Sequence, residues 1–205
     1  MDGETPDVGG VLDWPAMWRA LAVALRVHLD VGRRHLLTED VVRFATVMVL
    51  ADHGVTADRL SAERTVQGVG RIDLFVDAPS GTAVEFKFPR EPSEKNAADT
   101  MAFGETLKDF YRLAHLDVTD AWAVQLLRPS FVRYLNRRAE LDWKTQPGEV
   151  LVLPAGLAER LPVSASAALR NCATGEVRAH CHVAEMLGDD MLLAFQVQKV
   201  NTPAP

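Results

Sequence analysis

The first quarter of the chain places apolar residues at a helical period. Between Pro15 and about Leu29 they recur every three or four positions, which is typical of an amphipathic helix with proline in its first turn. A second helix is predicted from Thr38 to about His53, because Thr38 can cap the free amides at its start and Gly54 ends it. We expect both helices to pack an apolar face against a core.

The middle of the chain changes to the pattern of β-strands. Residues 71–77 and 82–88 are short, rich in aromatic and β-branched residues, and separated by Ala-Pro-Ser-Gly, so they predict a β-hairpin. Residues 62–67 are a weaker strand candidate before it. The other predicted elements are a helix after residue 96, a strand at 121–127, a helix at 130–140 and strands at 150–154, 176–183 and 191–200.

This order of elements predicts an α/β protein with a mixed β-sheet flanked by helices. Residues 1–12 and 203–205 are expected to be tails. No repeat or low-complexity linker divides residues 13–202, which predicts a single domain. A chain of 205 residues is long enough to bury one substantial core.

The composition is that of an ordinary globular protein, with 48% hydrophobic and 24% charged residues. The two cysteines, Cys172 and Cys181, are too few for a disulfide scaffold. The first residues lack the basic start and apolar run of a secretory signal, and no apolar stretch is long enough to span a bilayer. We therefore expect a cytoplasmic protein that does not interact with membranes.

The formal net charge of −6 by itself disfavours a protein that coats nucleic acid nonspecifically. Residues 31–140, however, contain 15 Lys and Arg against 16 Asp and Glu, so most of the excess acidity lies elsewhere in the chain. The charge thus argues only against tight, metal-free, nonspecific binding.

Three charged residues interrupt the predicted hairpin. Glu85 and Lys87 are two apart on one strand and share a face, and Asp73 can lie on the same face of the neighbouring strand. Two carboxylates and an ammonium suit a hard divalent cation such as Mg²⁺, and Glu39 on the preceding helix could add a third carboxylate. Glu39 equally suits the positive end of its helix and an ion pair with Arg43, so both interpretations stay open.

Glu39 on its helix, Asp73 in RIDLFVD and Glu85 with Lys87 in VEFKF resemble the PD-(D/E)xK nuclease superfamily, which includes restriction endonucleases and repair nucleases. Ile72 stands where the family motif has its nominal proline. The resemblance implies that Asp73 and Glu85 bind Mg²⁺, for which Mn²⁺ can substitute. It also implies that Glu39 is an auxiliary metal ligand and that Lys87 assists the attacking water.

The resemblance covers about residues 37–127. It implies a restriction-endonuclease-like αβββαβ core, followed by a C-terminal β-rich extension at 128–202. The implied activity is that of a metal-dependent endonuclease acting on nucleic acid, DNA in the first instance, in restriction, phage defence or repair, as in bacterial restriction- or defence-associated members. Specificity would then come from the C-terminal part, from a homodimer or from a partner protein.

Basic and polar residues near the hairpin and the following helix are candidate phosphate contacts, although a solvated helix face explains those on the helix equally well. These candidates are Arg71, Arg90, Lys95, Asn96, Lys108 and Arg112.

Two alternatives to a nuclease remain. One is a catalytically inactive nuclease-fold protein that binds nucleic acid or protein, and the other is a structural protein whose hairpin charges form an ordinary ion pair. No zinc site is expected at His180, Cys181 and His182, since in a strand the two histidines face opposite to the cysteine.

Overall fold

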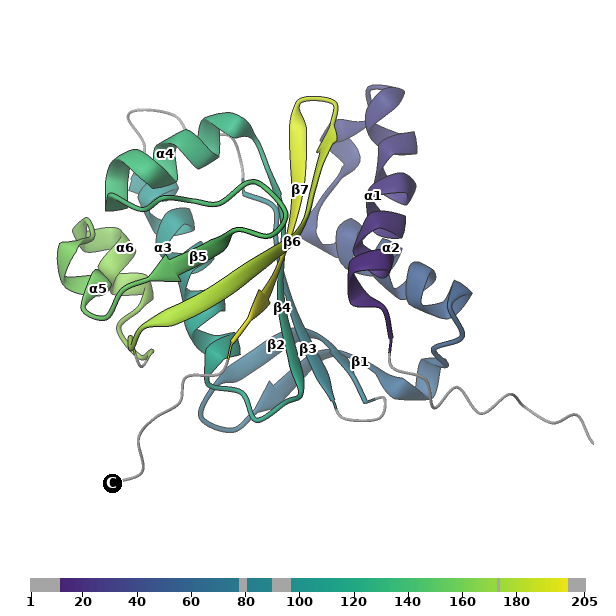
Figure 1. Ribbon diagram of the computed structural model, residues 1–205, viewed down its shortest axis with the longest axis horizontal. Coiled ribbons are helices and arrows are strands. Elements are labelled where there is room, and N and C mark those ends of the chain that lie inside the picture. Colours follow the sequence, from purple (N-terminus) through teal and green to yellow (C-terminus); the bar gives the residue numbers. More distant parts are fainter. Residues whose placement is uncertain (1–11, 78–80, 90–96, 173, 199–205) are drawn as a thin grey trace, which may run out of the picture.

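The computed structural model describes residues 12–77, 81–89, 97–172 and 174–198. Seven strands form one mixed sheet in the order β1-β2-β3-β4-β7-β6-β5, with helices on both faces (Figure 1). The strands are β1 Leu60–Val66, β2 Gly70–Val76, β3 Thr82–Lys87, β4 Asp120–Leu127, β5 Val150–Leu153, β6 Val177–Leu187 and β7 Asp190–Val197. The α-helices are α1 Trp14–Asp30, α2 Glu39–Asp52, α3 Ala97–Ala114, α4 Pro129–Ala139, α5 Leu157–Arg160 and α6 Val163–Ala168, and short 3₁₀ turns lie at η1 Arg34–Leu36 and η2 Ala57–Arg59.

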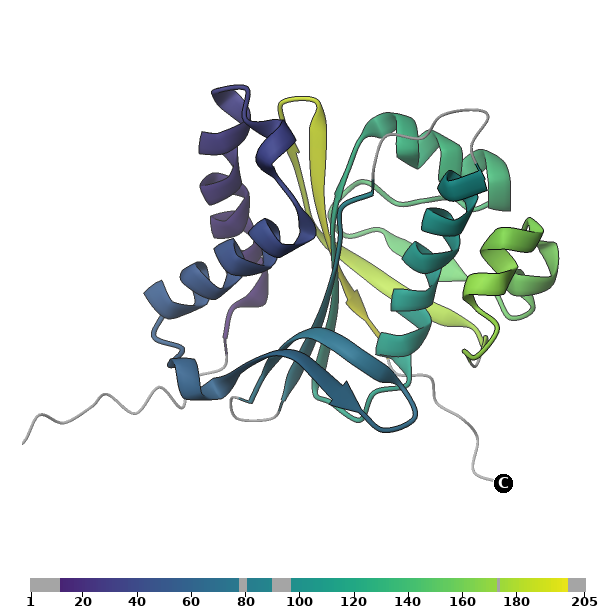
Figure 2. The same cartoon turned by 180° about the vertical axis from the view of Figure 1, so that it is seen from behind.

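Strands β3 and β4 form the one parallel pair among the seven described strands. Parallel neighbours need a crossover connection, and α3 supplies it. This helix therefore lies across one face of the central strands, where Figure 2 shows it from behind. The β1–β2 hairpin curls across the lower end of the sheet in the same view.

Each face of the sheet carries its own hydrophobic core. Helices α1 and α2 cover one face, where Trp18 packs with Val84, Phe86 and Trp122. Helices α3 to α6 cover the other face, where the core includes Ala83 and large side chains such as Phe110. Because strand side chains alternate, these assignments direct Glu85 and Lys87 of β3 toward α3.

The predicted mixed α/β architecture is confirmed, and so are its seven strands and its longer helices, to within a few residues at their ends. As expected, Thr38 caps α2 by accepting a hydrogen bond from the amide of Val41. Helices α5 and α6 were not predicted, because four and six residues are too few to display a helical period. The C-terminal strands continue the central sheet, since β7 pairs with β4.

In the described part of the chain, no helix combines the length and the apolar character that crossing a bilayer requires.

Candidate active site at the end of strand β3

The site begins where β2 and β3 separate. Their antiparallel pairing ends at Leu74 and Val84, so Asp73 and Glu85 are the next residues on the two strands. In place of a backbone carbonyl, the Asp73 carboxylate accepts a hydrogen bond from the amide of Phe86 at 2.8 Å. The Asp73 carboxylate lies close enough to Glu85 to raise the pKa of that carboxyl group. Two acidic side chains from adjacent strands therefore meet at one point.

Strand β2 twists at this point. Ile72 packs in the core beneath α3, whereas Leu74, two residues later, packs in the core beneath α1 and α2. On β1, Glu63 falls between the residues paired with Ile72 and Leu74, and it has a left-handed φ of 54°. The register of β1 and β2 is the same on both sides of Glu63, so this residue distorts the backbone of β1 without inserting an extra residue.

Helix α3 adds a third acid, Asp109, and an arginine, Arg112, to the site. Asp109 and Arg112 are three residues apart and therefore project from one side of the helix. Arg112 Nη1 lies 3.0 Å from Glu85 Oε1, and Lys87 Nζ lies 3.2 Å from Asp109 Oδ2. Glu85 and Asp109 are buried, with 3% and 5% of their surfaces exposed. Each base of the cluster thus faces a buried acid on the opposite element.

Glu39 reaches the cluster from the start of α2. Its Oε2 accepts a hydrogen bond from the amide of Phe88 at 3.1 Å and lies 3.7 Å from Lys87 Nζ. Arg43, the alternative partner weighed from the sequence, contacts Asp40 and Glu63 instead. The structure therefore places Glu39 beside Lys87, with the lysine between Glu39 and Asp109.

Burial and crowding of like charges shift the pKa values of these groups. Burial, followed by the nearby Asp109 and Asp73 carboxylates, raises the pKa of Glu85 to about 10. Burial also raises the pKa of Asp109 to about 7, although Lys87 and Arg112 oppose the shift. Burial favours a lower pKa for Lys87, but the Asp109 and Glu39 carboxylates outweigh it and raise the pKa above its ordinary value. Lys87 is therefore an ammonium at neutral pH.

The cluster contains more acid than base. The four carboxyl groups are those of Glu39, Asp73, Glu85 and Asp109, and the two cations are Lys87 and Arg112. With every group ionised, the net charge of the cluster is −2. A divalent cation would neutralise this charge.

A cavity of about 310 Å³ opens beside Glu39. It is lined by Arg34, His35, Leu37, Thr38, Glu39, Phe88 and Pro89. The Arg34 guanidinium contacts both carboxylate oxygens of Asp190, at 2.6 and 2.8 Å, and lies over the Phe88 ring at 5.1 Å. The ion pair between Arg34 and Asp190 therefore borders the space next to the cluster.

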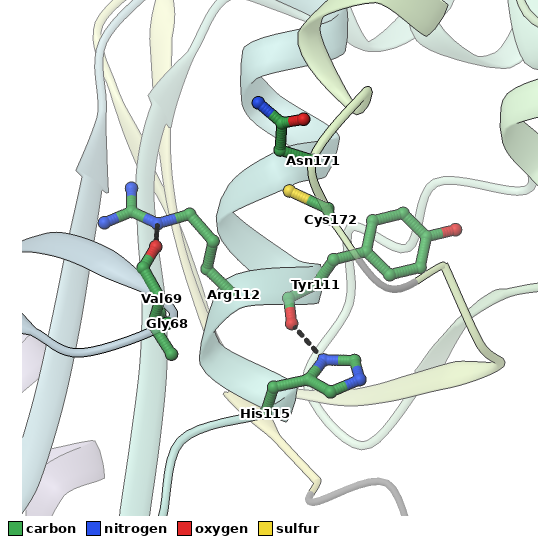
Figure 3. Close-up of a pocket in the computed structure, with 7 residues that line it drawn as sticks. All are labelled: Gly68, Val69, Tyr111, Arg112, His115, Asn171 and Cys172. Carbon is green, nitrogen blue, oxygen red and sulfur yellow. Dashed lines mark hydrogen bonds between the residues drawn. The ribbon is translucent and has the colours of Figure 1, made fainter.

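A second cavity, of about 110 Å³, lies behind Arg112 and is lined by Gly68, Val69, Tyr111, Arg112, His115, Asn171 and Cys172 (Figure 3). In this view the Arg112 side chain leaves α3 away from Tyr111 and reaches Val69. Its Nε donates to the Val69 carbonyl at 3.2 Å, and its Nη2 donates to the Arg71 carbonyl. These carbonyls belong to the β1–β2 turn and the start of β2, so the turn holds Arg112 against Glu85.

Sequence reasoning missed two residues at this site, Asp109 and Gln125. Gln125 of β4 is the register partner of Lys87 and is 1% exposed. Neither polar atom of its side chain has a hydrogen-bond partner within the described residues. The available signal was that Gln125 is the single polar residue in the apolar run AWAVQLL. For Asp109, the signal was an acid bordering the apolar face of a helix.

The proposed phosphate contacts are scattered. Arg71 is exposed and pairs with Glu63, and Lys108 pairs with Glu105 on the same helix. Arg112 faces the cluster rather than solvent, with 14% of its side chain exposed. Arg90, Lys95 and Asn96 lie outside the described residues.

As predicted, Cys181 points to the opposite face of β6 from the two histidines, and it is buried in the core beneath α3. Of the two histidines, His182 packs its ring against Trp122 of the opposite core. The ring centroids of His180 and His182 are 6.5 Å apart.

Within the residues that the structure describes, no three His, Cys, Asp or Glu side chains are arranged to hold a metal ion. Mg²⁺, however, is typically held by one or two carboxylates and completes its coordination with water and substrate phosphate. Asp73 and Glu85 meet this requirement, because they are adjacent on neighbouring strands and the cluster carries excess negative charge when every group is ionised. The donor set therefore fits a hard divalent cation.

The fold and the site define a mixed α/β protein with a buried cluster of acids and bases at the end of a central strand. Comparisons with protein-family models, with characterised proteins and with solved structures find no match for this chain.

Proposed function

We propose that the protein is a Mg²⁺-dependent nuclease of the PD-(D/E)xK type that hydrolyses phosphodiester bonds, with DNA as its substrate. The observation that carries this proposal is that Asp73, Glu85 and Lys87 come together at the end of β3, as the motif requires. The element order from α2 to β4 supports it as well. It runs helix, three antiparallel strands, helix and parallel strand, as an αβββαβ core requires.

Asp73 and Glu85 would hold the metal ion. When bound, such an ion lowers the pKa of a coordinated water and stabilises the negative charge that develops on the phosphate. The amide of Phe86 orients the Asp73 carboxylate by donating to one of its oxygens.

Lys87 contributes a positive charge and hydrogen-bond donors. Because its pKa is raised, it remains an ammonium and does not act as a general base. Asp109 and Glu39 flank the ammonium at 3.2 and 3.7 Å and fix its position. From there it can orient the attacking water and neutralise a phosphate oxygen.

Substrate would approach through the cavity beside Glu39. The Arg34 guanidinium at its border is held by Asp190, and a phosphate group that entered the cavity would compete with Asp190 for this guanidinium. The overall charge of −6 is compatible with this approach, since the acids of the cluster would be neutralised by bound metal.

Cleavage assays on supercoiled plasmid, linear duplex, single-stranded DNA and RNA, in Mg²⁺, Mn²⁺ or EDTA, test this function. The wild type should cleave DNA with either metal and not with EDTA. Glu85→Gln and Lys87→Met should each lose about 10²-fold or more in rate, since they remove a metal ligand and the charge next to the phosphate. The matched controls are Glu176→Gln and Arg178→Met. These two residues form an exposed ion pair at the start of β6.

The control variants should cleave like the wild type. If no substrate is cleaved under any condition, or if cleavage survives both site substitutions, the proposed activity is wrong. Metal-dependent binding of DNA without cleavage would favour the inactive nuclease-fold alternative.

A further inference from the structure

Arg112 occupies a position between two buried carboxylates. Its Nη1 lies 3.0 Å from Glu85 Oε1 and 3.7 Å from Asp109 Oδ1. In two-metal phosphodiesterase sites, the ions lie about 3.5–4 Å apart and act together on the attacking and leaving oxygens. The guanidinium of Arg112 therefore stands where a second cation would contact Glu85 and Asp109.

The guanidinium is fixed in that position. Nε donates to the Val69 carbonyl at 3.2 Å, and Nη2 donates to the Arg71 carbonyl, so all three nitrogens are engaged by the protein. Gly70, between these two carbonyls, has a φ of 104°, which favours glycine and shapes the turn around Arg112. Because arginine stays protonated in proteins, the positive charge is permanent.

The charge balance points the same way. With every group ionised, as a bound cation favours, the four carboxylates and two cations of the cluster among the described residues have a net charge of −2, and one divalent cation brings it to zero. A second divalent cation would leave a charge of +2 among largely buried groups, which is strongly unfavourable in a poorly solvated site.

We propose that Arg112 takes the place of a second metal ion and restricts the site to one divalent cation, held by Asp73 and Glu85. This inference rests on the proposed metal-dependent function. Arg112 is then a positioning residue, which holds Glu85 in place and supplies the charge that another metal ion supplies in two-metal sites.

Binding of Mn²⁺ to the full-length protein, without nucleic acid, tests the inference. Calorimetry gives the stoichiometry, and the electron paramagnetic resonance signal of free Mn²⁺ gives an independent count. The wild type should bind one Mn²⁺ per chain. Arg112→Met, which removes the guanidinium, should bind two.

Lys87→Met is the matched control. It changes the net charge by the same amount as Arg112→Met but leaves Arg112 in place, so it should still bind one Mn²⁺. Arg112→Gln is measured alongside, because its carboxamide can still donate to the Val69 carbonyl if Arg112→Met fails to fold. Circular dichroism establishes that each variant is folded.

Each result decides the question. Two ions on the wild type, or one ion on folded Arg112 variants, would overturn the role of Arg112 while leaving a metal-dependent activity in place. A second ion on Lys87→Met would show that net charge, not the position of Arg112, sets the count. No Mn²⁺ on the wild type at millimolar concentration would instead refute the proposed metal site.

Discussion

The burial of Glu85 destabilises the folded protein. It lies on a central strand with 3% of its surface exposed, among two further carboxylates. Buried charges are costly unless they are paired, and buried ion pairs contribute little to stability compared with apolar packing. Arg112, at 3.0 Å from Glu85 Oε1, offsets the cost only in part, since burial and the neighbouring carboxylates keep the pKa of Glu85 raised to about 10. An arrangement of this kind is explained by function better than by stability.

Gln125 provides a test of the same reasoning. A buried carboxamide without partners costs about 1–3 kcal/mol, so Gln125→Leu should leave the free energy of unfolding unchanged or raise it by up to about that amount. Urea denaturation measures the difference. The control is Gln196→Leu on β7, because the Gln196 amide donates to Asp120 at 2.8 Å. We expect the control to be destabilised by about 1 kcal/mol. Loss of stability in Gln125→Leu would mean that the carboxamide is satisfied in solution.

His182 gives stability a dependence on pH. Burial, including contact with the Trp122 ring at 5.3 Å, lowers the pKa of His182 below the ordinary value of 6.5, with His180 adding to the shift and Gln196 opposing it. The unfolded chain then binds the proton more readily than the folded one. The stabilisation is complete above about pH 6.5 and declines as the pH falls toward the lower folded-state pKa.

We therefore expect the free energy of unfolding to fall more steeply from pH 6.5 to 5 in the wild type than in His182→Gln. Urea denaturation across this range measures both slopes. His28→Gln, at an exposed position on α1, controls for loss of a histidine. Equal slopes in the wild type and His182→Gln would contradict the prediction.

Part of the site was predictable from local sequence. Glu85 and Lys87 share a face because strand side chains alternate, and the short hairpin connection brings Asp73 opposite them. Asp109 was not predictable in this way, since its approach to Lys87 depends on how α3 lies over β3. The same packing turns Arg112 inward, where the sequence suggested a phosphate contact.

At the scale of elements, periodicity identified every long helix and every strand; most of them bury a continuous face, whereas β1 is largely exposed and was the weaker candidate. It did not reveal the sheet order, in which β4 pairs with β7 rather than with β5, since non-local pairing leaves no periodic signal. Nor did it reveal why α3 contains Gly104. By helix propensity alone, a glycine at this position only destabilises the helix.

In the structure, Gly104 is where α6 packs against α3. A Cβ atom at this position would come 2.4 Å from the Ala165 carbonyl oxygen and 2.8 Å from Ala168 Cβ. Gly104→Ala should therefore destabilise the protein by about 1–3 kcal/mol, despite a gain of about 1 kcal/mol in helix propensity. Chemical denaturation measures the change.

The double variant Gly104→Ala with Ala168→Gly serves as the control for this contact. It should recover only part of the loss, because the closest atom belongs to the backbone of Ala165. A Gly104→Ala protein as stable as the wild type would show that α6 can move away from α3 without cost.

At the scale of the whole molecule, metal binding and folding should be linked. The cluster joins β2, β3, α2 and α3, so an ion held by Asp73 and Glu85 favours the folded chain over the unfolded one, in which these groups are dispersed. A ligand that binds only the folded state at 100 times its dissociation constant adds about 2.7 kcal/mol. Mn²⁺ should therefore raise the melting temperature progressively with its concentration.

Differential scanning calorimetry at increasing Mn²⁺ concentrations measures this linkage. The reference is the metal-free protein in buffer that contains EDTA. Asp73→Asn and Glu85→Gln should abolish the rise in melting temperature, whereas Glu176→Gln, at the exposed pair with Arg178, should keep it.

Glu39→Gln distinguishes the two interpretations of that residue. If Glu39 is an auxiliary metal ligand, the variant loses part of the rise; if it only holds Lys87 and the Phe88 amide, the rise is unchanged while the metal-free stability falls. An equal rise in Glu85→Gln and the wild type would place the ion elsewhere on the chain.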